Sequence, residues 1–111
     1  MFAHIHGRLV EKTPTDVVID CNGVGYHLQI SLHTFSKLPE SESVKLYTYL
    51  QIKEDAHTLF GFAEKSEREI FKLLLSVSGI GAGIARTMLS SMEPKSIIQA
   101  IATGDVASIQ S

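Results

Sequence analysis

The residues whose types and spacing are best suited to chemistry form the run Gly79-Ile80-Gly81-Ala82-Gly83. An apolar helical pattern ends just before this run, and a second one, carrying Ala85, follows it. Gly79 and Gly81 permit backbone angles that residues with a Cβ atom resist, so we expect a tight turn and a close backbone approach. The unpaired N–H groups and the positive dipole end of the second helix suit a phosphate oxygen. This helix-hairpin-helix pattern predicts a sequence-independent grip on a nucleic-acid backbone; the alternative is a packing turn in a small helical bundle.

A second candidate is the acidic pair Glu54-Asp55, which interrupts two strand-like segments. Aspartate is a favoured turn residue, so on composition alone the pair predicts an exposed hairpin turn. Two carboxylates without further oxygen ligands nearby in the sequence make a poor metal site.

The histidines do not suggest an active site. His4 and His6 lie two residues apart on one strand and therefore on one face. His27, His33 and His57 share no spacing with them, and no cysteine or carboxylate pattern completes a metal site. The sequence also lacks the glycine-rich loop of P-loop proteins and the nucleophile elbow of hydrolases. We therefore predict no catalytic residue, no metal and no cofactor.

The elements that must position the two candidates begin with a β-rich half. Apolar and polar residues alternate in five segments, 3–12, 16–21, 24–31, 44–53 and 57–62. Asn22-Gly23 is a strong hairpin signal, and residues 32–38 predict a short helix or turn. Gly7, Gly25 and Gly61 fall inside strands, where we expect bends or bulges. Five strands with short turns predict a small closed or nearly closed barrel over residues 1–63.

The second half is helical. Ser66 and Glu69 fit a capping box, and an apolar stripe follows at helical spacing. The stripe consists of Ile70, Phe71, Leu74, Leu75 and Val77. After the glycine run, a helix through Met88 and Leu89 is expected.

Pro94 suits the first turn of a further helix carrying Ile97, Ile98 and Ile101. Gly104 is expected to stop that helix and Asp105 to cap one more. Residues 105–111 supply barely two turns, too few for a stable element. We therefore expect residues 64–111 to be an incomplete helical domain.

Composition limits the partners. The formal net charge is −2, from ten basic and twelve acidic side chains, so any affinity for DNA must come from a local patch or from backbone amides. The lone Cys21 cannot form an internal disulfide, which agrees with a reducing cytosol. No apolar run approaches the roughly 20 residues of a membrane span, and no signal peptide is apparent. We expect a soluble cytoplasmic protein that does not bind membranes.

Six short segments occur together in a specific order: Gly7-Arg8-Leu9, Asn22-Gly23-Val24-Gly25-Tyr26, Lys53-Glu54-Asp55-Ala56-His57, Leu59-Phe60-Gly61-Phe62, Glu67-Arg68-Glu69-Ile70-Phe71-Lys72-Leu73-Leu74 and Ser78-Gly79-Ile80-Gly81. In this order they resemble the RuvA family, the Holliday junction-binding subunits of the bacterial branch migration complex. The resemblance implies an α+β fold, with a five-stranded OB-type barrel followed by a helix-hairpin-helix domain. It also implies a non-catalytic homotetramer, or an octamer of two tetramers, that holds a four-way junction open. In the family this subunit works with the RuvB motor and the RuvC resolvase in DNA recombination, repair and the SOS response.

The resemblance assigns roles to individual residues. Glu54 and Asp55 match the acidic pin, which stands near the fourfold centre and repels the phosphates at the crossover. Lys53 beside the pin is expected to contact a phosphate, and the turn amides of Gly79 to Gly83 to hold the duplex arms without base readout. The family usually has a basic residue after the Gly-x-Gly turn, whereas this chain has Ala82-Gly83. The grip is therefore expected to use amides alone, or amides helped by Arg86.

The family has a second helix-hairpin-helix motif and a C-terminal domain that recruits RuvB. We expect both to be missing here by truncation or proteolysis rather than in a natural short form.

Two other functions remain open. A general single-strand-binding OB module would stack bases on Tyr47, Tyr49, Phe60 and Phe62, although alternation places some of these inside the barrel and basic residues are sparse. A non-DNA oligomerisation scaffold would instead pack the glycine turn against protein.

Overall fold

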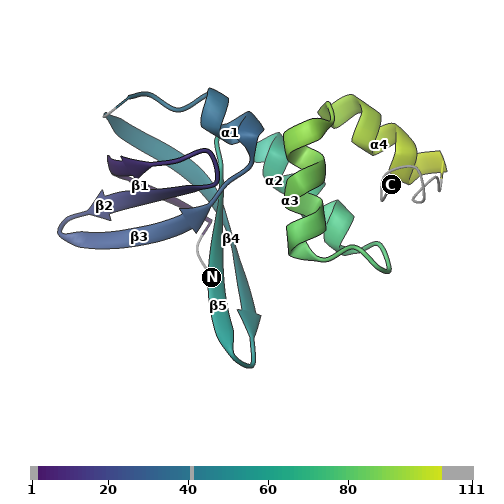
Figure 1. The fold of residues 1–111 in the computed structure, drawn as a ribbon, viewed down its shortest axis with the longest axis horizontal. Coiled ribbons are helices and arrows are strands. Elements are labelled where there is room, and N and C mark those ends of the chain that lie inside the picture. Colours follow the sequence, from purple (N-terminus) through teal and green to yellow (C-terminus); the bar gives the residue numbers. More distant parts are fainter. Residues whose placement is uncertain (1–2, 41, 104–111) are drawn as a thin grey trace.

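The computed structural model describes residues 3–40 and 42–103, and it divides into a β-rich and a helical part (Figure 1). The strands are β1 (His4–Lys12), β2 (Asp16–Cys21), β3 (Val24–Gln29), β4 (Ser43–Lys53) and β5 (Ala56–Phe62). The helices are α1 (Leu32–Ser36), α2 (Lys65–Leu75), α3 (Ala82–Ser91) and α4 (Pro94–Thr103). The predicted strands are confirmed to within one or two residues at each end.

The strands form a closed barrel in the order β1-β2-β3-β5-β4. Neighbours pair antiparallel except β3 and β5, which run parallel and meet at Gln29 and Phe60. The barrel closes because β1 also pairs with β4. This arrangement fits the OB type, with α1 between β3 and β4. The closed-barrel prediction is confirmed.

Alternating side chains fill the barrel. Its buried apolar residues are Ile5, Leu9, Val17, Ile19, Leu28, Ile30 and Leu46. The β2–β3 hairpin turns at Asn22 and Gly23, whose φ angles are 54° and 91°, as the Asn-Gly signal predicts.

The strand glycines do not form bulges, and two of them, Gly7 and Gly61, allow close approach. The pairing register is regular at Gly7, Gly25 and Gly61, and the one shift in β1 lies between Leu9 and Glu11. A Cβ atom on Gly7 would lie 2.5 Å from the Asp20 carbonyl oxygen, and one on Gly61 would lie 2.9 Å from Leu28 Cδ2. The predicted bulges at these positions are wrong, because a narrow barrel needs room for neighbouring atoms there.

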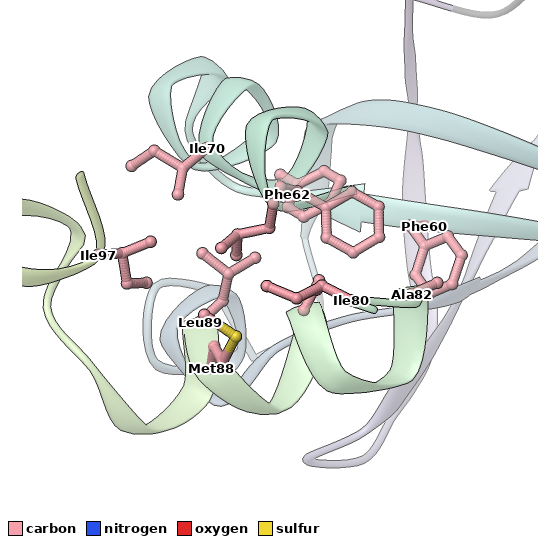
Figure 2. Packing of buried hydrophobic residues seen from close by; sticks show 11 residues of the cluster. Phe60, Phe62, Ile70, Ile80, Ala82, Met88, Leu89 and Ile97 are labelled. Carbon is pink, nitrogen blue, oxygen red and sulfur yellow. The ribbon is translucent and has the colours of Figure 1, made fainter. Parts of the chain in front are cut away.

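The helices cover the outer face of β4 and β5 and share a core with it (Figure 2). Phe60 and Phe62 point out of the barrel and pack on Phe71 of α2, with ring centroids 5.0 and 5.1 Å apart. Tyr49 meets the same ring edge-on at 5.6 Å. The last strand ends at Phe62 and α2 begins at Lys65, and the apolar core runs across the predicted division between residues 63 and 64.

The predicted capping box at the start of α2 is wrong. The helix begins at Lys65 after Glu64, which makes no side-chain cap, and Ser66 lies within the first turn. Glu69 does not reach back; it lies 3.2 Å from Arg68 Nε and 3.8 Å from Lys72 Nζ. The local capping signal is therefore not used, and Glu67 in the first turn instead bonds to Ser31 and Thr34 of the α1 segment.

The last described helix, α4, begins at Pro94 as predicted. Ile97 is fully buried and Ile101 packs on the core, whereas Ile98 is 49% exposed. The predicted stop at Gly104, the cap at Asp105 and the short segment 105–111 lie outside the described residues. Among the helices of residues 3–40 and 42–103, none is long and apolar enough to cross a membrane.

Candidate nucleic-acid interface

The β4–β5 hairpin extends beyond the barrel wall and ends at the acidic pair (Figure 1). Lys53 and Ala56 form the last pair of the ladder, so Glu54 and Asp55 make up the whole turn. Both acidic side chains are exposed, and neither forms an ion pair within the described residues. Two exposed carboxylates at one turn repel phosphate and attract cations.

The hairpin tip also carries a basic and an apolar side chain. Lys53 is exposed beside the carboxylates, and Ile52 on the same strand is 63% exposed. An ammonium next to two carboxylates allows a phosphate contact at the side of the tip while the end remains anionic.

Gly79 to Gly81 lie between α2 and α3, and Ala82 and Gly83 open α3, so the run joins two helices. Gly79 has φ of +88° and so occupies a conformation that other residues rarely adopt. Gly81 is the N-cap of α3 with φ of −92°, which is open to any residue, so the expectation that it needs glycine for the turn is wrong. The side chains of Ile80 and Ala82 are buried in the core, and only their backbone is available for binding.

The start of α3 presents unpaired donors. The first intrahelical bond runs from Ala85 N to Gly81 O at 2.9 Å, so the amides of the three preceding residues have no intrahelical acceptor. Gly81 has no side chain to cap them. A Cβ atom at Gly81 or Gly83 would meet nothing within 4 Å, so another molecule can approach this backbone closely.

Arg86 does not extend from the turn. It is half-buried, and its Nη1 donates to the carbonyl oxygen of Thr15 at 3.3 Å, between β1 and β2. Arg86 therefore has a hydrogen-bond partner in the β1–β2 turn of the barrel.

The aromatic residues considered for base stacking are used in the core. Phe60 and Phe62 are 3% and 2% exposed, and Tyr47 and Tyr49 pack against the same cluster. The expectation that some of them lie inside the barrel is wrong, because their strand faces point at the helices. The sequence pattern of a strand does not show which of its two faces lines the barrel interior and which one packs against helices.

The histidines have ordinary partners. His27 Nε2 lies 2.9 Å from Asp16 Oδ1, and His33 Nε2 lies 2.8 Å from Glu64 Oε1. The hydrogen bond from His33 is the largest cause lowering the pKa of Glu64; partial desolvation opposes it, and Lys37 at 4.0 Å adds to it. In the part of the chain that the structure describes, no three His, Cys, Asp or Glu side chains gather as metal ligands do.

Sequence reasoning missed one polar site. Glu67 is 1% exposed and bonds to Ser31 and Thr34, which are equally buried. No local pattern connects residues more than 30 positions apart, so nothing in the sequence marked it.

The fold and the candidate interface define an α+β protein in which a closed OB-type barrel carries an acidic hairpin and is followed by packed helices. The family model described as the RuvA N terminal domain matches residues 1–61, and the chain belongs to this family. Three relatives named Holliday junction branch migration complex subunit RuvA match all of it. They are 73% identical in Flavobacterium psychrophilum, 64% in Christiangramia forsetii and 57% in Cytophaga hutchinsonii. The chain spans 58%, 58% and 56% of their respective lengths.

Proposed function

We propose that this chain forms the junction-binding part of a RuvA-type subunit, which binds four-way DNA junctions without catalysing a reaction. The observation that carries the proposal is the presence of two features in one chain whose barrel and helices share an apolar core. An isolated acidic tip ends the β4–β5 hairpin, and a helix start with uncapped amides lies on the helical side. The relatives' names, which refer to Holliday junction branch migration, support it.

The two features would act in opposite directions on DNA. The amides at Gly81, Ala82 and Gly83 would hold phosphates of a duplex arm in a sequence-independent way. Glu54 and Asp55 would repel phosphates at the crossover and so disfavour re-pairing of the strands. A linear duplex offers phosphates to the amides but no open centre for the carboxylates, so junctions would bind better.

The assembly and partners follow from the family. In this proposal four copies surround the junction and bring their hairpins to the centre, or two such tetramers enclose it. The RuvB motor supplies ATP-driven movement, RuvC resolves the junction, and the complex works in the cytoplasm. Lys53 would support the grip at the hairpin, and Arg86 would support it at α3 with the guanidinium N–H groups that do not bond to Thr15.

Competition binding tests the proposal. A labelled four-way junction is bound by the protein and displaced with unlabelled junction, linear duplex or single strand of equal nucleotide content, at one stated salt concentration. We expect the junction to compete best. Equal competition by all three would refute junction recognition, and a preference for single strands would favour the single-strand-binding alternative. No binding to any DNA, with an intact oligomer, would favour the scaffold alternative.

A further inference from the structure

Glu67 is a buried carboxylate held by two hydroxyl groups. It occupies the third residue of α2 and is 1% exposed. Its Oε2 accepts a hydrogen bond from Ser31 Oγ at 2.5 Å, and its Oε1 accepts one from Thr34 Oγ1. Ser31 is the N-cap of α1 and Thr34 lies within that helix. The carboxylate therefore joins α2 to α1.

The hydroxyl groups are oriented by the backbone. Ser31 Oγ accepts from Thr34 N at 3.1 Å, and Thr34 Oγ1 accepts from Ala63 N at 3.1 Å. A backbone N–H only donates, so both hydroxyl protons remain directed at Glu67. An ionised carboxylate, which only accepts, satisfies this arrangement fully. In the described residues Glu67 forms no ion pair, so the two hydroxyl groups are the partners that hold it.

The bonds meet where the barrel joins the helices. Ala63 directly follows β5, the strand that forms one side of the acidic hairpin. Two further bonds tie α1 to the helices: His33 to Glu64 at 2.8 Å, and Leu32 N to Ser90 Oγ of α3 at 3.0 Å. The core beneath is apolar, and apolar burial is not directional. The hydrogen bonds are therefore the directional interactions between the barrel and the helices.

We propose that Glu67 is a positioning residue that sets the orientation of α2 and α3 relative to the β4–β5 hairpin. It would thereby fix the spacing between the carboxylates of Glu54 and Asp55 and the amides that open α3. A junction offers its crossover and its arms at a set separation, so a fixed spacing favours junctions over other DNA. This last step rests on the proposed function; the orientation itself does not.

Thr34 offers a matched pair of variants that leaves the Glu67 side chain in place. T34V keeps the shape but removes the hydroxyl, whereas T34S keeps the hydroxyl. E67Q keeps the size of the side chain but replaces one carboxylate oxygen with an NH₂ group. This donor then faces a hydroxyl group whose proton already points at it. I19V serves as the control, because it perturbs only the barrel interior.

The direct readout is a distance. Spin labels at H57C and T87C, both exposed positions, report on the hairpin and on α3 in a C21A background. The full-length protein is labelled and diluted into an excess of unlabelled protein so that distances within one subunit dominate. We expect E67Q and T34V to shift or broaden the distance distribution, and T34S and I19V to retain the wild-type one. Unchanged distributions in E67Q and T34V, or an equal change in I19V, would overturn the proposal.

The second readout is the ratio of junction to duplex affinity, measured on the unlabelled variants. We expect the ratio to fall about threefold to tenfold in E67Q and T34V but not in T34S or I19V. An unchanged ratio together with an altered distance would reject the link to selectivity. If the wild type shows no junction preference, the proposed function fails, and the distances still decide the role of Glu67.

Discussion

Phe71 of α2 lies 5.0 Å from Phe60 of β5, measured between ring centroids, and it is fully buried. The same ring contacts Phe62 and Tyr49, so one side chain of the helical part holds three aromatic residues of the barrel strands. The helices therefore depend on the outer face of the barrel for their core. We therefore expect the barrel and the helices to unfold as one unit.

Phe71→Ala is expected to lower the free energy of unfolding by about 3–5 kcal/mol, because it removes the ring from the centre of a shared core. Chemical denaturation followed by far-UV circular dichroism and by tyrosine fluorescence should give coincident transitions in the wild type. I98A, on an exposed face of α4, is the control and should change stability by less than about 0.5 kcal/mol. Separate barrel and helix transitions in the wild type would contradict the single unit.

The ion pair between His33 and Glu64 predicts a pH effect. The pKa of Glu64 is lowered in the folded state from its ordinary value of 4.5, so the unfolded chain takes up the proton first as pH falls. The stabilisation is thus complete above that value and is lost as pH falls through the lowered pKa.

The difference in unfolding free energy between wild type and E64Q should accordingly shrink as pH falls below about 4.5. Urea titrations at a series of pH values measure it. In an H33A background the decline should be smaller, since His33 supplies the largest part of the shift. A difference that grows on acidification would contradict this assignment.

Two double variants of the acidic tip distinguish the effect of its charge from the effect of its side-chain shape. Neither Glu54 nor Asp55 has a positive φ, so E54A/D55A should leave the fold and assembly intact. The isosteric E54Q/D55N removes the charge alone. We expect both double variants to lose junction-over-duplex preference and to alter junction processing, because repulsion at the crossover is gone. Competition binding and size-exclusion chromatography test this; loss of folding or assembly in both would refute the pin assignment.

The strands were predictable because local signals agree. Alternation, the Asn22-Gly23 turn and the Glu54-Asp55 break each define a strand end within a few residues. The predicted third strand ran too far, to residue 31, because Ser31 leaves the sheet to cap α1. A capping serine after an alternating run is indistinguishable from one more strand residue.

What the sequence could not predict involves contacts between distant segments. Alternation shows that Phe60 and Phe62 share a face, but it cannot show that helices rather than barrel interior cover them. Ser66 matches a capping pattern, yet α2 already begins at Lys65, and the bonds from Ser31 and Thr34 to Glu67 have no local signal. Arg86 donates to the Thr15 carbonyl oxygen, 71 positions away, and no local pattern indicates this contact; its role toward a phosphate stays a prediction. These arrangements depend on partners far away in the chain.

The glycine run allows stability and binding to be separated. Gly79 has φ of +88°, so G79A should cost about 1–2 kcal/mol of stability and weaken DNA binding through misfolding of the turn. That variant alone cannot distinguish a packing turn from a phosphate site. Gly83, within the first turn of α3, has open space around its missing side chain.

G83A is therefore expected to stabilise the protein by about 0.5–1 kcal/mol, because alanine is the better helix residue. Its methyl group would nevertheless project onto the surface where the amides of Ala82 and Gly83 face outward. If these amides hold a phosphate, junction affinity should fall while the melting temperature rises. Thermal denaturation and competition binding on the same preparation measure both effects. A more stable G83A with wild-type affinity for every DNA form would leave the run as a packing turn and remove the amides from the interface.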